Sequence, residues 1–455
     1  MHHNHLGEPM NHYTSVLCKL VFALGGAFTA TVSYAQGPPL TLDEAARRSA
    51  VEAAARLLRE RYVFPEVGNR AAQAIESALG AGTYDGIEQP SAFAQRLTED
   101  LQGVAKDKHL RVSALGAGPP VGPDGQPPRP PPRADGGVTR VDMLGDRVGY
   151  IEVVGFPPEI VAKEPIDRAM SALKDARALI IDVRRNGGGA PDSVTHLVSY
   201  FVKGDASVHV NTFINRNPGT ETFNSQKFWS DSVPVSLAGK PVYVLTSGFT
   251  FSGGEEFAYD MQVLGLGEIV GETTGGGANP GGMMPLAAGL AMFVPGGRAE
   301  NPITKTNWEG VGVKPDIAAP SADALKVALE RLSVSPAGAD VDTLSVASLF
   351  APRTTAQPGT EAAVRRMSEE NARGEPNYDL MVPQFAEAAR NQLPRLKEMF
   401  SSLGPIESVK FIEVGPAGGD VYEVHYANGA IRWMIALTPD GKTAMAGVQP
   451  LPRQP

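Results

Sequence analysis

The chain is poor in cysteine, because Cys18 is the only one among 455 residues. It precedes the apolar run LVFALGGAFTATV, whereas the lipid-modified cysteine of a lipoprotein follows such a run, so no lipid anchor is expected. Once the N-terminal leader described below is removed, no thiol remains. The mature chain can therefore have neither disulfides nor cysteine catalysis.

The chain also lacks an excess of positive charge and, beyond its N-terminus, long apolar runs. Its 41 Lys and Arg residues are outnumbered by 50 Asp and Glu residues, which gives a net charge of -9. This charge argues against a nucleic-acid partner, because nothing in the sequence supplies a basic face to neutralise phosphates. No stretch after the leader approaches the ~18 apolar residues of a membrane span, so no stable membrane insertion is expected. The length favours two or three domains.

The N-terminus has the pattern of a cleavable targeting segment. Lys19 precedes the apolar run, and Ser33-Tyr34-Ala35 supplies a small-x-small cleavage pattern before Gln36. We expect cleavage after Ala35 and a periplasmic or secreted mature protein. The early histidines then belong to a discarded leader rather than to a metal site: His2, His3, His5 and His12. No metal and no cofactor are predicted.

The composition divides the rest of the chain into segments. We predict a helical region over 36–115, a Pro/Gly-rich linker over 116–137, an α/β core over 138–335, a connector over 336–357 and a small α+β domain over 358–455. In the helical region Thr41 is the expected N-cap of the first helix. In the core, helices are expected at 165–173, 191–201 and 254–264, and strands at 138–143, 148–154, 179–183, 208–214, 242–245 and 269–270.

The stretch from Tyr243 to Gln262 predicts a strand, a tight turn and a helix. The turn places Ser252 where the first helical N–H groups have no internal partner, so an anion formed beside its oxygen would meet backbone donors and the helix dipole. Two interpretations remain open from these residues alone. Ser252 is either a nucleophile or an ordinary helix N-cap.

A second glycine-rich loop, Arg184 to Gly189, follows the apolar strand and precedes a helix. It lacks the lysine and serine pair of a phosphate-binding loop. It is either a flexible turn or a loop whose small residues let backbone N–H groups approach a developing oxyanion. The presence of Ser252 at a helix start favours the second interpretation.

Four motifs occur in a characteristic order: LIIDVRRNGGG, YVLTSGFTFSGGEEFAYDMQ, IVGETTGGGANP and NWEGVGVKPDI. Together they resemble the S41 serine peptidases, the superfamily of tail-specific proteases and interphotoreceptor retinoid-binding proteins. The resemblance implies a crotonase-like and ClpP-like core of ββα units, preceded by helices. The C-terminal segment weakly resembles cystatin-like or NTF2-like accessory domains, and no chemistry is assigned to it.

The resemblance offers two catalytic arrangements. A serine and lysine dyad is excluded, because no lysine lies between Ser252 and Lys305. The tricorn-like arrangement of serine, histidine and glutamate is matched by His109 and Glu309. In it Ser252 would attack the carbonyl, His109 would transfer its proton and Glu309 would stabilise the imidazolium.

The resemblance also assigns roles to glycines. The amides of Gly253 and Gly189 are the expected oxyanion donors, with Gly188 as the near alternative. The loop that carries Gly275, Gly276 and Gly277 is expected along the substrate cleft.

Several residues have competing interpretations. His196 is the main rival base, interpreted here as a packing or surface residue. Glu309 is alternatively a solvated loop acid, while Glu255 and Glu256 are expected to favour the helix N-terminus electrostatically. Lys108 stands beside His109 where some relatives carry a small hydroxyl residue, which bears on the strength of the base.

The sequence therefore predicts an exported serine endopeptidase acting on peptides or unfolded proteins. Two alternatives remain: a non-catalytic binding protein for peptides or apolar ligands, and an esterase or amidase for small substrates. An oligomer is compatible with the sequence.

Overall fold

The computed structural model describes residues 41–114, 136–204, 207–334, 355–415, 419–438 and 441–451. The predicted leader lies outside these residues, as do 116–135 of the predicted linker and 336–354 of the predicted connector. Within the described ranges, no helix is both long and apolar enough to cross a membrane.

Three helices open the described chain: α1 (Glu44–Arg61), α2 (Pro65–Gly80) and α3 (Pro90–Ala105). The expected N-cap Thr41 is wrong. Asp43 caps α1 instead, because its side chain accepts a 2.7 Å hydrogen bond from the N–H of Ala46. The helices share one apolar core with strands β1 (Arg111–Ala114) and β10 (Leu290–Pro295), so a late segment of the core sequence completes the N-terminal region.

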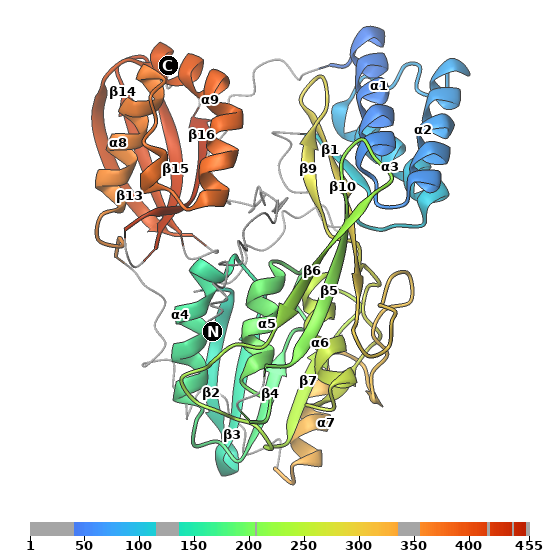
Figure 1. Cartoon of the computed structure of the whole chain (residues 1–455), viewed down its shortest axis with the longest axis vertical. Helices are drawn as coiled ribbons and strands as arrows, with labels where there is room; N and C mark the ends of the chain where they lie inside the picture. Colours follow the sequence, from blue (N-terminus) through green and yellow to red (C-terminus); the bar gives the residue numbers. More distant parts are fainter. Residues whose placement is uncertain are drawn as a thin grey trace, which may run out of the picture.

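The α/β core is built on a six-stranded sheet, which confirms the predicted fold class (Figure 1). The strand order is β12-β8-β7-β4-β3-β2, comprising Ile317–Ala318, Glu268–Gly271, Val242–Thr246, Ala178–Asp182, Val148–Val153 and Val138–Leu144. Only the β2·β3 pair is antiparallel. Every residue of β4 and β7 is buried, as expected for central parallel strands covered on both faces.

Helices α4 (Glu159–Ala172), α5 (Pro191–Ser199), α6 (Gly253–Val263) and α7 (Ala324–Arg331) accompany this sheet. The predicted start of α4 at Pro165 is wrong, because the helix begins six residues earlier and keeps this proline inside. Its buried face already includes Ala162, so helical packing extends before the proline. The short 3-10 turn η1 (Gly145–Arg147) joins β2 to β3.

Two three-stranded sheets flank the core and were largely absent from the sequence-based prediction. One has the order β1-β10-β9, with β9 at Gly281–Pro285. The other has the order β11-β5-β6, with β11 at Gly297–Glu300, β5 at His209–Arg216 and β6 at Phe223–Trp229. Of these strands the sequence predicts only two, at 110–113 and at 208–214, which correspond to β1 and β5.

The C-terminal part contains α8 (Thr360–Arg373), η4 (Tyr378–Leu380), α9 (Pro383–Leu403) and an antiparallel sheet of β13 (Ile406–Val414), β14 (Asp420–Tyr426), β15 (Gly429–Leu437) and β16 (Thr443–Leu451). It forms the orange and red body of Figure 1 and has its own apolar core. Trp433, Tyr422 and Tyr426 are buried in that core, so all three pack inside the domain.

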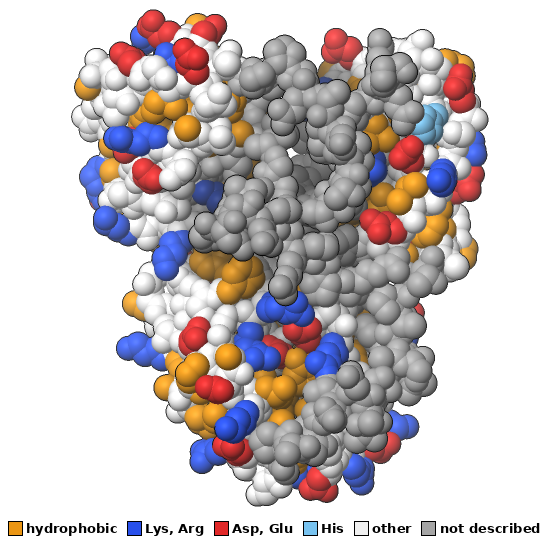
Figure 2. Space-filling model, turned by 180° about the vertical axis from the view of Figure 1, so that it is seen from behind, with side chains coloured by type: hydrophobic (Ala, Val, Ile, Leu, Met, Phe, Trp, Pro, Cys, Tyr) orange, Lys and Arg blue, Asp and Glu red, His pale blue; other side chains and the backbone are white. Residues whose placement is uncertain are grey.

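The surface visible in Figure 2 carries acidic and basic side chains side by side. Neither sign of charge dominates the described part of this face. The mixture agrees with the modest net charge of -9.

Candidate active site

Ser252 stands at the N-cap of α6, after a turn that is tied to the neighbouring glycine-rich loop. Thr250 donates its hydroxyl to the carbonyl of Val183 over 2.9 Å, and the N–H of Phe251 donates to the carbonyl of Asn186 over 3.0 Å. Ser252 has φ 53° and ψ -119°, a conformation that side chains rarely adopt. Such a strained residue at a helix start is a signal of function rather than of ordinary capping.

Glu255 holds this turn against the loop that follows β8. Its buried carboxylate accepts hydrogen bonds from the N–H of Ser252 (2.8 Å), the Thr274 hydroxyl (2.5 Å) and the N–H groups of Gly276 (2.6 Å) and Gly277 (2.8 Å). Burial nevertheless raises its pKa, against the opposing effect of these bonds. The sequence-based interpretation missed this bridging role, although Ser252 and Glu255 have capping-box spacing.

The backbone beside Ser252 presents two unoccupied donors. A Cβ atom built on Gly188 would lie 2.7 Å from Cβ of Ser252 and 3.0 Å from N of Gly253, so the glycine loop touches the serine turn. The N–H of Gly188 already donates to Oδ1 of Asn186 over 2.8 Å. Within the described chain no acceptor faces the N–H of Gly189 or of Gly253. Gly189 and Gly253 are therefore better placed as oxyanion donors than Gly188.

His109 follows α3, after Lys106 ends that helix in a left-handed conformation with φ 57°. Its ring is buried and lies 4.6 Å from the ring of Phe251 and 5.5 Å from that of Phe293, centroid to centroid. Burial, followed by the charge of Arg111, lowers the pKa of His109 to about 3. The imidazole is therefore neutral at physiological pH, and its Nδ1 has no hydrogen-bond partner among the described residues.

Glu309 lies on the loop after β11, and its carboxyl group comes close to His109. Its Oε2 accepts a 2.5 Å hydrogen bond from the N–H of Ala278, while Oε1 is buried without a partner in the described structure. Burial and the nearby charge of Asp107 raise its pKa to about 8. Ligand-type atoms of Asp107, His109 and Glu309 all lie within 4.8 Å of one another.

Asp107 is a site residue that the sequence-based interpretation missed. Its Oδ1 accepts the N–H of His109 over 2.9 Å and lies 4.0 Å from Nδ1 of the same residue. Its Oδ2 accepts hydrogen bonds from the Tyr62 hydroxyl (3.0 Å) and the Asn279 amide (2.9 Å). Asp107 thus anchors the backbone of His109, and only its position two residues earlier could have signalled this.

The predicted residues converge, but they are not all in contact. His109 and Glu309 are brought together, and His109 packs on Phe251, the neighbour of Ser252. In the described structure no hydrogen bond joins Ser252 to His109. Gly277 lies against both aromatic rings, since a Cβ on it would lie 2.3 Å from Phe251 and 2.7 Å from His109.

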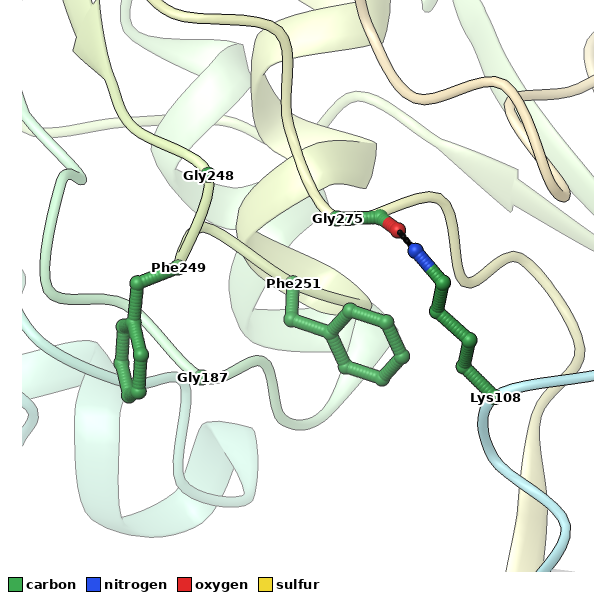
Figure 3. Close-up of a pocket in the computed structure, with 6 residues that line it drawn as sticks. All are labelled: Lys108, Gly187, Gly248, Phe249, Phe251 and Gly275. Carbon is green, nitrogen blue, oxygen red and sulfur yellow. Dashed lines mark hydrogen bonds between the residues drawn. The ribbon is translucent and has the colours of Figure 1, made fainter. Parts of the chain in front are cut away.

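An open pocket of about 360 Å³ adjoins the serine turn (Figure 3). It is lined by Lys108, Gly187, Gly248, Phe249, Phe251 and Gly275. Nζ of Lys108 donates a 2.6 Å hydrogen bond to the carbonyl of Gly275, which ties the segment before His109 to the loop beyond Ser252. Of the three glycines that the sequence predicts along a substrate cleft, Gly275 lines this pocket, whereas Gly276 and Gly277 do not.

The rival histidine lies elsewhere. His196 is fully buried on α5, with Nε2 2.7 Å from Oδ1 of Asp167 and Nδ1 3.3 Å from Nζ of Lys163. With Glu159 and Asp231 it forms a second group whose atoms are close enough for a metal ion, but the ammonium of Lys163 already pairs with both acids. His196 thus belongs to an ion-pair cluster between α4 and α5.

Two models of known protein families together match most of the described residues that precede the C-terminal part. The model of peptidase family S41 matches residues 147–319. The model described as the N-terminal domain of Peptidase_S41 in eukaryotic IRBP matches residues 40–146.

Solved structures give weaker likenesses. A protein from Parabacteroides merdae assigned as a peptidase is 20% identical over 63% of this chain and 96% of its own, with a TM-score of 0.47. The photosystem II D1 C-terminal processing protease is 14% identical over 60% of this chain and 93% of its own, with a TM-score of 0.39. The tricorn protease is 16% identical over 64% of this chain and 36% of its own, with a TM-score of 0.42.

Proposed function

This chain belongs to peptidase family S41 and is a serine peptidase, and from that premise we propose that it cleaves peptides or unfolded proteins through an acyl-enzyme on Ser252. Oγ of Ser252 attacks the scissile carbonyl while His109 takes its proton. The protonated imidazole then delivers this proton to the leaving amine. Water enters, loses a proton to His109 and attacks the acyl carbon, and His109 then returns this proton to Oγ of Ser252 as the acid product leaves.

The single observation that carries this proposal is the backbone geometry around Ser252. The serine has a positive φ at a helix start, and the N–H groups beside it, on Gly189 and Gly253, have no protein acceptor in the described chain. Preorganised donors of this kind stabilise the oxyanion of acyl transfer, typically by about 10²–10³ in rate for each donor. An ordinary N-cap needs neither feature.

The base and its partner are assigned by burial and proximity. Nδ1 of His109 is buried on the side of Asp107, which leaves Nε2 for the serine hydroxyl. Glu309 supplies a carboxyl group for the imidazolium, since its Oε1 has no other partner in the described structure. Substrate binding must bring Ser252 and His109 within hydrogen-bond reach, as often happens when a resting site closes on its substrate.

Peptide hydrolysis by matched variants tests the proposal. A quenched fluorescent peptide is incubated with the wild type, Ser252→Ala and the control Ser232→Ala, which alters an exposed serine. We expect the first variant to lose about 10⁴-fold or more in kcat/KM, as nucleophile removal does in other serine peptidases, and the control to match the wild type. Equal hydrolysis by wild type and Ser252→Ala would overturn the assignment.

Two other functions use the same fold and are separated by their substrates. A binding protein would show no hydrolysis that depends on Ser252, while binding peptides or apolar ligands. A small-substrate esterase would show a higher kcat/KM for aryl esters than for any peptide. The pocket and the unoccupied amides favour the peptidase, because a carrier has no need of oxyanion donors.

We also propose that the mature enzyme is exported and begins at Gln36. The support is the sequence pattern before Ala35. N-terminal sequencing of the chain recovered from the periplasm or the medium should start at Gln36. Recovery of the uncleaved chain from the cytoplasm alone would contradict export.

A further inference from the structure

The pocket beside Ser252 carries an inference about substrate choice that rests on the proposed function. Phe249 and Phe251 belong to the serine turn, and Gly187 precedes the glycines of the oxyanion loop. A side chain entering here would therefore belong to a residue close to the scissile carbonyl. In Figure 3 the ring of Phe249 lies beside the backbone at Gly187, whereas the ring of Phe251 points toward the side chain of Lys108.

The walls of the pocket are aromatic rings and glycine backbone. Phe249 is 67% exposed, which is unusual for so large an apolar side chain and leaves its ring available to a ligand. Gly187 has open space around it, because a Cβ there would meet nothing within 4 Å. The volume of about 360 Å³ is in the range of known ligand pockets and is ample for a single side chain.

Lys108 supplies the one ionic group of the lining. Its side chain is exposed, and its Nζ bonds to the carbonyl of Gly275 but to no acidic side chain among the described residues. The positive charge at the pocket is therefore uncompensated by any ion pair in the described chain. A cationic substrate side chain would meet like charge and would lose its hydration beside aromatic walls.

We propose that this pocket binds the side chain of the residue that contributes the scissile carbonyl, that it selects an apolar or aromatic side chain, and that Lys108 makes it reject lysine and arginine. Full burial of an apolar side chain of leucine or phenylalanine size is worth a factor of roughly ten to a hundred in affinity. An exposed ion pair contributes at most about fivefold. Apolar side chains should thus rank first, glutamate second and basic side chains last.

Matched peptides that differ only at this residue test the ranking. The peptides carry leucine, glutamate or lysine, and kcat/KM is measured for the wild type and for Lys108→Glu. Any loss of activity that is common to both substrates cancels in the ratio of their kcat/KM values. We expect a leucine-to-lysine ratio of about 50 or more in the wild type and at least a tenfold fall in that ratio in Lys108→Glu.

The control variant is Lys106→Glu, which makes the same change of charge two residues away and outside the pocket lining. It should keep the wild-type ratio. The proposal is overturned if the wild type cleaves the lysine peptide as well as the leucine peptide, or if Lys106→Glu changes the ratio as much as Lys108→Glu. Fluorophosphonate labelling of Ser252 in each variant separates a failure of the pocket proposal from a failure of the serine mechanism. If Ser252 is labelled but the peptides are cleaved without selectivity, only the pocket proposal is overturned. If Ser252 is not labelled, the serine mechanism itself is overturned.

Discussion

At the scale of single residues, the site is defined by a buried histidine and a half-buried glutamate whose pKa values shift in opposite directions. Burial lowers the pKa of His109 to about 3 and, with the charge of Asp107, raises that of Glu309 to about 8. Both shifts have the same cause, because burial away from water disfavours the charged form of each side chain. At neutral pH the resting site therefore holds a neutral imidazole beside a protonated carboxyl group.

This arrangement predicts the pH dependence of the reaction. Glu309 stabilises the imidazolium only as a carboxylate, so kcat/KM should rise with pH until it levels off above about 8. Glu309→Gln should lower kcat/KM by about 10³-fold and should remove this rise, because no group then ionises there. Measuring kcat/KM of both proteins between pH 5 and 10 checks this prediction. If Glu309→Gln keeps the rise of kcat/KM with pH, the rise belongs to the ionisation of another group.

The oxyanion loop gives a second prediction at a single residue. Gly189 has φ 145°, and a Cβ on it would lie 1.9 Å from the carbonyl oxygen of Phe156. Gly189→Ala must displace the loop, so we expect kcat to fall by about 10²-fold or more. Gly219→Ala, whose added Cβ meets nothing within 4 Å, is the control. An unaffected kcat in Gly189→Ala would exclude this amide from the mechanism.

At the scale of elements, helix α6 carries three buried acids, Glu255, Glu256 and Asp260. Glu255 joins its first turn to the loop of Gly276 and Gly277. Glu256 and Asp260 are both fully buried on the same helix, one turn apart. Burial is the main cause that raises the pKa of each, and their mutual repulsion adds to the shift of Asp260.

The buried acids predict a loss of stability at high pH. An unfolded glutamate releases its proton near pH 4.5, whereas folded Glu256 keeps it to higher pH, so the folded state binds more protons above pH 4.5. Stability must therefore fall as pH rises above that value. Glu256→Gln keeps an acceptor for the 3.0 Å bond from Asn211 and removes the ionisation.

We expect Glu256→Gln to melt about 5 °C higher than the wild type at pH 9 and at the same temperature at pH 4. Thermal unfolding followed by circular dichroism at the two pH values measures this difference. Equal melting temperatures at both values would show that Glu256 does not carry the effect.

At the scale of the whole molecule, the catalytic groups come from distant parts of the chain. His109 precedes the sheet, Ser252 lies between β7 and α6, and Glu309 follows β11. The C-terminal body has a separate apolar core made of residues from 356 to 448. None of the proposed catalytic groups belongs to it.

This separation predicts that the C-terminal body is dispensable for the chemistry. A chain that ends at Asp340 should keep kcat/KM for a short peptide within about threefold of the wild type, because independent domains fold around their own cores. Activity and circular dichroism of the shortened chain check the expectation. A folded but inactive product would show that the C-terminal body takes part in catalysis.

The sequence predicted local features better than long-range ones. Apolar runs located the central strands, and the Ser252 turn followed from a strand and a helix separated by glycines. The strand pair β1·β10 aligns Arg111 with Phe293, a pairing that no local pattern encodes. The hydrogen bonds of Asp107 with Tyr62 and Asn279 likewise depend on tertiary structure. Only the family resemblance predicted His109 and Glu309 as partners of Ser252.

The central claim is that Ser252 is a nucleophile activated by His109. Its most direct test is the rate and position of phosphonylation by a fluorophosphonate, measured by mass spectrometry of peptides from the wild type and from His109→Ala. We predict a single adduct, on Ser252, and a rate at least about 10³-fold lower in His109→Ala. An adduct on another residue, or an equal rate in the two proteins, would contradict the account.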